Sequence, residues 1–200
     1  MLGDLRRRAR MKVAVLCEFS GIVRDAFIAK GHRAVSCDLL PSERPGAHLI
    51  EDIMDRDWSG FDLVIAHPPC THLAVSGARW FKGKEEEQEK ALDLVRFILN
   101  LDVPMIALEN PVSIISTRIR KPDQIIRPWQ FGHPEAKTTC LWLKNLPLLK
   151  PTNILPKQRW QNQTPSGQNK LGPSPTRWKD RSRTYQGIAD AMADQWRGLG

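Results

Sequence analysis

Short apolar runs alternate with amphipathic segments along this chain. Apolar runs typical of buried strands cover residues 12–17, 34–38, 48–53, 61–66, 104–108 and 138–143. Helical spacing of apolar residues is found at 22–30, 84–101 and 188–196. Strands that alternate with helices predict an α/β fold, with a mostly parallel sheet and helices on both faces.

The pattern also divides the chain into regions. Residues 1–10 are basic and precede the first strand, so we expect a disordered extension there. Residues 11–143 hold the strands and predict the core. Residues 144–182 lack periodicity and are rich in Pro, Gly, Gln and Asn, which predicts a small irregular segment. Residues 183–200 are expected to form a C-terminal helix that packs on the core.

Charge changes this picture by suggesting a partner. The net charge is +8, and the irregular segment contains many Lys and Arg with one acid, Asp180. Such a balance favours polyanions, because bound cations release counterions from phosphates. No apolar run is long enough to span a bilayer, so no membrane partner is expected.

Polar residues follow several of the expected strands, and in open parallel sheets ligands bind at the carboxyl ends of strands. Asp38, after the second strand, could hold the ribose hydroxyls of an adenosine, and Asp52 could accept from an adenine amino group. A solvated turn acid is the alternative for both, and it is the favoured one for Asp52. Gly21 stands alone, without the glycine patterns of phosphate cradles, which argues against NAD or ATP.

The sharpest feature is the sequence His67-Pro-Pro-Cys70, directly after a strand. Two prolines stiffen the backbone and so fix the direction of the next side chain. A thiol in this place is a candidate nucleophile. The alternative is a rigid turn with an idle cysteine. No Cys-x-x-Cys pair is present, and we expect no metal site.

The second feature is Glu109-Asn110-Pro111, after a fully apolar strand. Burial there is expected to raise the pKa of Glu109, so that the carboxyl can give a proton to a ring nitrogen. The alternative is a solvated Glu109 beside an Asn110 that caps a turn.

In order and spacing, Pro69-Cys70 and Glu109-Asn110 resemble the catalytic residues of the DNA cytosine-C5 methyltransferases. The chain is similar to the short cytosine-methyltransferase-like proteins encoded by phages and prophages. The resemblance covers residues 11–143 and 181–196. It implies a Rossmann-like fold that binds S-adenosylmethionine, with Cys70 as nucleophile and Glu109 as its acidic partner.

The resemblance extends to the cofactor motifs. Phe19-Ser20-Gly21 is similar to the family's Phe-x-Gly-x-Gly but has only one of its glycines. Asp38 and Asp52 stand at the positions of the family's ribose and adenine acids. The residues expected at the cofactor are Glu18, Phe19, Ser20, Gly21, Asp38, Asp52 and Pro68.

The substrate motifs match less closely. Thr71 replaces a Gln after the catalytic cysteine, and residues 131–139 resemble the motif Tyr-Gly-x-Pro-Gln-x-Arg-x-Arg, with Lys137 at its first Arg. Residues 183–196 resemble the closing motif. The residues expected at the substrate are Thr71, Asn110, Lys137 and Arg183. Only about 40 residues are left for target recognition, too few for the family's usual domain.

Together these resemblances imply a monomer that methylates C5 of cytosine in bacterial or phage DNA, in the cytoplasm, through addition of Cys70 to C6. Two alternatives stay open. One is a related pyrimidine-modifying enzyme that acts on RNA or on a free nucleotide. The other is a non-catalytic DNA-binding or decoy protein, which the missing glycine and arginines favour.

Overall fold

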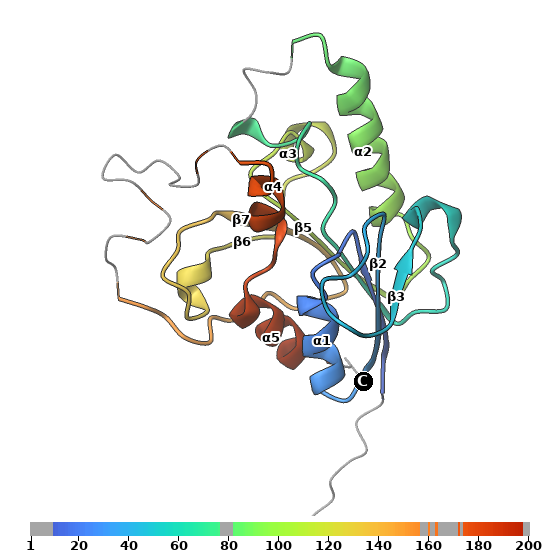
Figure 1. Ribbon diagram of the computed structural model, residues 1–200, viewed down its shortest axis with the longest axis vertical. Helices are drawn as coiled ribbons and strands as arrows, with labels where there is room; N and C mark the ends of the chain where they lie inside the picture. Colours follow the sequence, from blue (N-terminus) through green and yellow to red (C-terminus); the bar gives the residue numbers. More distant parts are fainter. Residues whose placement is uncertain are drawn as a thin grey trace, which may run out of the picture.

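The protein is described here by a computed structural model, which covers residues 10–76, 82–156 and 174–197, together with Trp160, Gln163 and Gly172 (Figure 1). The extension expected at residues 1–10 lies outside this description except for Arg10. A seven-stranded sheet runs through the molecule in the order β3-β2-β1-β4-β5-β7-β6. Its strands are β1 (Lys12–Leu16), β2 (Arg33–Asp38), β3 (His48–Ile50), β4 (Leu63–Ala66), β5 (Met105–Asn110), β6 (Gln124–Ile126) and β7 (Thr139–Lys144).

Most of the sheet is parallel. The strands from β3 to β5 pair in parallel, whereas β7 runs antiparallel to both β5 and β6. The α/β class and the mostly parallel sheet predicted from the sequence are therefore confirmed.

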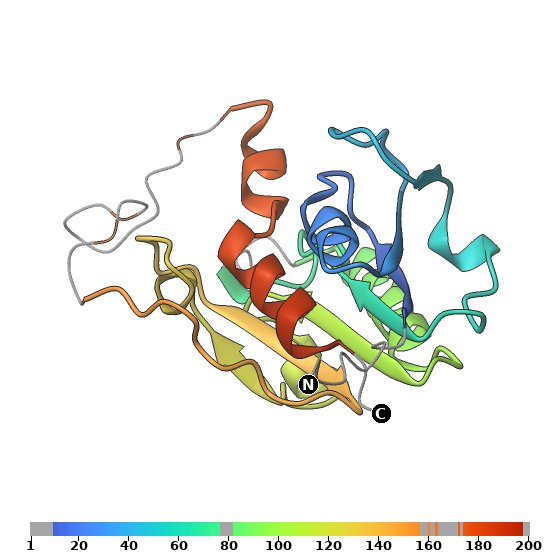
Figure 2. The same cartoon turned by 90° about the horizontal axis from the view of Figure 1, so that it is seen from below.

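Helices cover both faces of the sheet. They are α1 (Ile22–Ala29), α2 (Glu85–Leu99), α3 (Ile115–Arg118), α4 (Arg177–Ser182) and α5 (Gln186–Gln195), with short 3-10 turns at Ile53–Asp55 and Pro128–Gln130. Helices α1 and α5 lie side by side on one face, and α2 covers the other (Figure 2).

Strand β4 shows how the sequence builds two cores. All four of its residues are buried. Leu63 and Ile65 point to the α1 and α5 side, whereas Val64 and Ala66 point to the α2 side. Alternation on a strand buried on both faces explains why its sequence is apolar throughout rather than at every second position.

Several elements differ from the expectation. The predicted strand at 48–53 ends at Ile50, because Asp52 instead accepts a hydrogen bond from the Met54 amide and begins a 3-10 turn. Strand β6 and helices α3 and α4 were not predicted. Each is six residues or shorter, which is too short to show a period.

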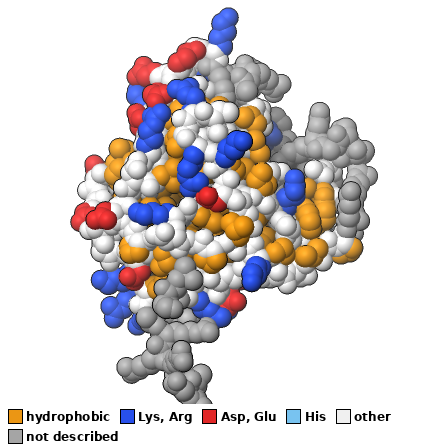
Figure 3. All heavy atoms as spheres, turned by 180° about the vertical axis from the view of Figure 1, so that it is seen from behind, with side chains coloured by type: hydrophobic (Ala, Val, Ile, Leu, Met, Phe, Trp, Pro, Cys, Tyr) orange, Lys and Arg blue, Asp and Glu red, His pale blue; other side chains and the backbone are white. Residues whose placement is uncertain are grey.

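The surface carries both signs of charge. Figure 3 shows acidic and basic side chains interspersed on one face. The first turn of α2 contains three acids, Glu85, Glu86 and Glu87. Among the described residues, no helix has the length and apolar character needed to cross a membrane.

Candidate active site

The strand order places a switch point between β1 and β4. From β1 the chain proceeds outward to β2 and β3, and then returns to β4 on the other side of β1. In doubly wound sheets, ligands bind outside the carboxyl ends of the strands at such a point. The loops after β1 and β4 and the end of β5 all lie at this carboxyl edge.

Glu18 organises the loop after β1, and only 4% of this residue is exposed. Its carboxylate accepts hydrogen bonds from the amides of Val23 (2.7 Å) and Arg24 (3.2 Å) and from the Ser20 hydroxyl. An acid on the free amides of a helix N-terminus stabilises that terminus. Glu18, expected at the cofactor, therefore binds the first turn of α1 with both of its oxygens.

Gly21 begins α1 in a left-handed conformation, with φ of 71°. A Cβ at this position would lie 2.6 Å from the guanidinium of Arg24. Arg24 is fully buried, pairs with Asp25 at 2.8 Å and donates to the Ser36 hydroxyl and the Pro45 carbonyl. Close packing against this cation, together with the positive φ, requires glycine at position 21.

Asp38 and Asp52 lie close enough to the Cys17 thiol to raise its pKa, which burial raises most. Asp38 accepts from the Leu40 amide at 3.0 Å and Asp52 from the Met54 amide at 3.0 Å, in each case through Oδ1. The Oδ2 atoms are acceptors of the kind that a ribose or an adenine amino group needs. The pair of acids at this edge thus fits the donor groups of an adenosine in its chemistry.

Cys70 is held in a turn after β4. Its carbonyl accepts from the amides of Leu73 (3.0 Å) and Ala74 (2.8 Å). Pro68 is buried, Thr71 is exposed and Cys70 is half-buried. Burial, with a smaller contribution from Glu109, raises the pKa of the Cys70 thiol, while Lys137 and Arg181 oppose the shift.

Glu109 reaches the same place from the neighbouring strand. Ala66 pairs with Leu108 in the β4–β5 register, so the next residues, His67 and Glu109, lie side by side. His67 Nδ1 is 3.0 Å from Glu109 Oε2. Asn110 follows on the other face and donates to the Pro68 carbonyl at 2.9 Å.

The pKa expected for Glu109 is corrected by this geometry. Burial raises the pKa, but the hydrogen bond from His67 and the positive charge of Lys137 outweigh it, so the pKa is lowered. Glu109 also belongs to β5 instead of following it, because antiparallel pairing with Leu141 on β7 extends the strand. The residue is therefore a fixed carboxylate in the resting protein.

Lys137 connects the motif before β7 to helix α4. Its ammonium donates to the Arg181 carbonyl at 2.8 Å and lowers the pKa of both Cys70 and Glu109. Tyr185, just before α5, donates to Glu135 and lies within electrostatic range of Glu109. Cys70, Glu109 and Lys137 thus lie within electrostatic range of one another.

Helix α4 covers the β1–α1 loop. Trp178 packs on Phe19 with ring centroids 5.9 Å apart, and the Lys179 ammonium lies 5.8 Å from the Phe19 ring. Arg183, expected at the substrate, forms two hydrogen bonds with Glu43 at 2.8 and 2.9 Å and another with Asp180. Its guanidinium therefore joins α4 to the loop after β2.

Between α4 and the β1–α1 loop lies a cavity of about 10 Å³, the space of roughly one water. It is lined by Cys17, Glu18, Phe19, Ser20, His67, Ser182 and Thr184. The acids and hydroxyls of this edge suit the donor groups of S-adenosylmethionine in their chemistry, whereas the cavity beneath the α4–α5 connection has room for about one water.

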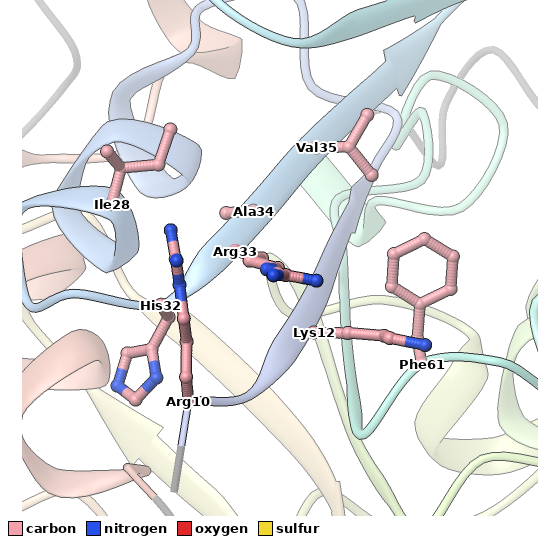
Figure 4. A pocket seen from close by; sticks show the side chains of 8 residues that line it. All are labelled: Arg10, Lys12, Ile28, His32, Arg33, Ala34, Val35 and Phe61. Atoms are coloured by element: carbon pink, nitrogen blue, oxygen red, sulfur yellow. The ribbon is translucent and has the colours of Figure 1, made fainter. Parts of the chain in front are cut away.

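A larger cavity lies at the opposite edge of the sheet. Its volume is about 360 Å³, and its walls combine cations with apolar side chains (Figure 4). The lining residues are Arg10, Lys12, Ile28, His32, Arg33, Ala34, Val35 and Phe61. None of the residues predicted at the site lines it.

Sequence reasoning missed several residues of the site. His67 was not predicted as a partner of Glu109, although its place one residue beyond β4 aligns it with that residue. Arg181 lies in α4 and Tyr185 directly precedes α5, both far from Cys70 in sequence. No local pattern marks residues that reach a site only through the return of the C-terminal segment.

No family model and no curated protein matches the chain. Among solved structures it is similar to a triple mutant of DNMT2 from Spodoptera frugiperda, with 16% sequence identity and a TM-score of 0.43. The match covers 74% of this chain and 56% of that one, so the chain spans little more than half of the neighbour's length.

Proposed function

We propose that this chain is a methyltransferase that moves a methyl group from S-adenosylmethionine to C5 of cytosine in DNA. One observation carries the proposal: a thiol after β4 and a buried carboxylate at the end of β5 interact at the switch-point edge. Acids suited to an adenosine lie at the same edge, after β2 and β3.

The initial protonation states support a defined first step. The Cys70 thiol begins protonated because its pKa is raised, and Glu109 begins ionised because its pKa is lowered. As the sulfur bonds to C6 of cytosine, the thiol proton passes to the Glu109 carboxylate and from there to N3 of the ring. The result is an enamine with a nucleophilic C5 and a sulfur–carbon bond at C6.

Bound S-adenosylmethionine would supply an electrophilic methyl group on its sulfonium. Asp38 and Asp52 would hold the adenosine of the cofactor, and the β1–α1 loop would face its amino-acid part. After C5 has gained the methyl group, loss of the C5 proton expels the Cys70 thiolate and the N3 proton leaves, which restores the aromatic ring.

Lys137 and Arg181 would place positive charge beside the reacting thiol, where a phosphate of the substrate could also bind. In duplex DNA the target base must leave the stack, at a cost of a few kcal/mol. The exposed Trp178 is an aromatic surface on the same side of the molecule.

The test is methyl transfer from tritiated cofactor to duplex DNA, single-stranded DNA, RNA and dCMP, followed by nucleoside mass spectrometry. We expect 5-methylcytosine in DNA and none with Cys70→Ser. Transfer to RNA or dCMP alone would replace the substrate, and undiminished transfer by Cys70→Ser would remove the thiol from the mechanism.

A non-catalytic nucleic-acid-binding protein is the second candidate. It is favoured by the small cavity beneath the α4–α5 connection and by the engagement of Glu18 and Arg183 within the protein. Calorimetry separates the two candidates, since this alternative requires DNA binding without binding of S-adenosylmethionine or its demethylated product.

A further inference from the structure

The ring of His67 joins two parts of the carboxyl edge. Its Nδ1 lies 3.0 Å from the carboxylate of Glu109, and the two side chains are only 7% and 11% exposed. Its Nε2 is buried and has no hydrogen-bond partner among the described residues. The same ring lines the cavity beneath the α4–α5 connection.

The bond to Glu109 determines which nitrogen carries the proton. A carboxylate only accepts hydrogen bonds, so Nδ1 must carry a proton, and in the neutral tautomer with that proton Nε2 carries a lone pair. The lowered pKa of Glu109 agrees with an ionised carboxylate in this pair. The geometry therefore leaves a buried acceptor at the wall of the cavity.

Two of the hydroxyls beside this acceptor already donate to other groups. Ser20 and Ser182 both line the cavity, but the Ser20 hydroxyl donates to Glu18 and the Ser182 hydroxyl donates to the Trp178 carbonyl. A buried acceptor without a partner is unfavourable, and such atoms in folded proteins commonly mark a place for water or a ligand.

We propose that His67 is a positioning residue that links cofactor binding to the catalytic carboxylate. Its Nδ1–H fixes Oε2 of Glu109 and so leaves Oε1 to the pyrimidine, while its Nε2 accepts a hydrogen bond from an ammonium group in the cavity. This inference rests on the proposed function, in which the ammonium is that of the cofactor's amino-acid part.

The backbone holds the ring in this double contact. His67 follows the buried strand β4 and precedes Pro68 and Pro69, which restrict its backbone. The Asn110 amide ties the Pro68 carbonyl to β5 at 2.9 Å. The backbone on both sides of His67 is thus fixed before any ligand is present.

The first experiment needs no ligand. Nitrogen-15 NMR of the histidine rings near neutral pH should show the His67 proton on Nδ1, and Glu109→Gln should shift that signal. A proton on Nε2, or a His67 signal that does not respond to Glu109→Gln, would overturn the inference whether or not the protein is a methyltransferase.

The second experiment uses two substitutions, each of which replaces the imidazole by a side-chain amide near one of its two nitrogen positions. His67→Asn places an amide near the Nδ1 position, and His67→Gln places one near the Nε2 position. For S-adenosylhomocysteine, calorimetry should show about tenfold weaker binding with His67→Asn and near wild-type binding with His67→Gln. In turnover, His67→Gln should lower kcat at least tenfold with little change in KM for the cofactor.

A matched probe identifies the group that is bound. Methylthioadenosine lacks the amino-acid part, so wild type and His67→Asn should bind it equally. Equal binding of S-adenosylhomocysteine by both proteins, or equal losses for both ligands, would contradict the ammonium contact. Failure of wild type to bind either ligand would instead refute the cofactor in the proposed function, while the NMR result still decides the His67–Glu109 pair. Circular dichroism checks that both variants fold.

Discussion

The carboxyl and amino edges of the sheet differ in the volume of their cavities and in the chemistry of the surrounding residues. The carboxyl edge has a cavity of about 10 Å³ that is lined in part by the His67 imidazole, and the same imidazole contacts the buried Glu109 carboxylate. The amino edge has about 360 Å³ surrounded by cations and apolar side chains, with Lys12 and Phe61 on one side and Arg10 and Ile28 on the other (Figure 4). Volume alone would select the amino edge, whereas convergent chemistry selects the carboxyl edge.

The topology explains where the reactive groups gather. Parallel strands end at the same edge, so the residues after β1, β2 and β4 and at the end of β5 meet there regardless of their distance in sequence. The helices return the chain to the amino edge, which collects strand starts. Substitutions that affect one edge only therefore test whether the reaction takes place at the edge with the reactive groups or at the edge with the larger cavity.

The largest expected effect is loss of the thiol. Cys70→Ala should lower methyl transfer more than about 1,000-fold, because no other group can form the bond to C6. Its urea midpoint should stay close to that of wild type, since Cys70 is only half-buried. Initial rates with tritiated cofactor measure the effect, and residual activity above one-tenth of wild type would contradict it.

The next effect concerns the carboxylate. Glu109→Gln keeps the size of the side chain but cannot carry the thiol proton to N3, so kcat should fall about 100-fold. Glu86→Gln is the matched control, because Glu86 is an exposed carboxylate paired with Lys90 on α2, away from the site. Similar rates for both variants would deny Glu109 its role.

A smaller effect concerns the pH dependence of Cys70. Because the thiol pKa is raised, its alkylation by iodoacetamide should continue to accelerate above about pH 10, where an ordinary thiol is nearly fully ionised and its rate levels off. Lys137→Met should move that profile further to alkaline pH, because Lys137 lowers the Cys70 pKa. Lys150→Met serves as the control, and mass spectrometry of the Cys70 peptide gives the rates.

A profile that levels off by about pH 10 would contradict the buried, protonated thiol. An unchanged profile in Lys137→Met would show that this ammonium does not act on Cys70.

Some parts of the molecule could be predicted from the sequence, and others could not. Strands such as β4 were predicted because burial on both faces leaves an apolar run, and Cys70 and Glu109 were predicted because they follow or end such runs. The direction of β7 could not be predicted, because an apolar run does not indicate whether its strand is parallel or antiparallel to the neighbouring strands. The helix α4 and its contacts through Trp178 and Arg183 depend on tertiary packing alone.

A modest effect on stability is expected from Arg183→Met. The Arg183 guanidinium lowers the pKa of Glu43, so their pair stabilises the fold above the unfolded pKa of about 4.3 and loses this contribution as the pH falls. Both side chains are about one-third exposed, so the loss should be about 0.2–1 kcal/mol at pH 7. Urea unfolding at pH 7 and pH 3 measures it, and an equal loss at both values would contradict the pairing.

The smallest effect is expected at the amino edge. Lys12→Gln and Arg33→Gln change the walls of the larger cavity without contacting the residues after β1, β4 or β5. Methyl transfer at saturating DNA should stay within about twofold of wild type. A loss of methyl transfer comparable to that of Glu109→Gln would indicate that the reaction takes place at the amino edge.

The most direct measurement uses DNA that contains 5-fluorocytosine, in which the step that releases the cysteine is blocked. With S-adenosylmethionine present, the protein should become covalently attached to this DNA, and mass spectrometry should place the bond on Cys70. Cys70→Ser should form no such complex. A wild-type protein that binds the DNA and the cofactor but yields no adduct, or an adduct on another residue, would contradict the assignment of Cys70 as the nucleophile.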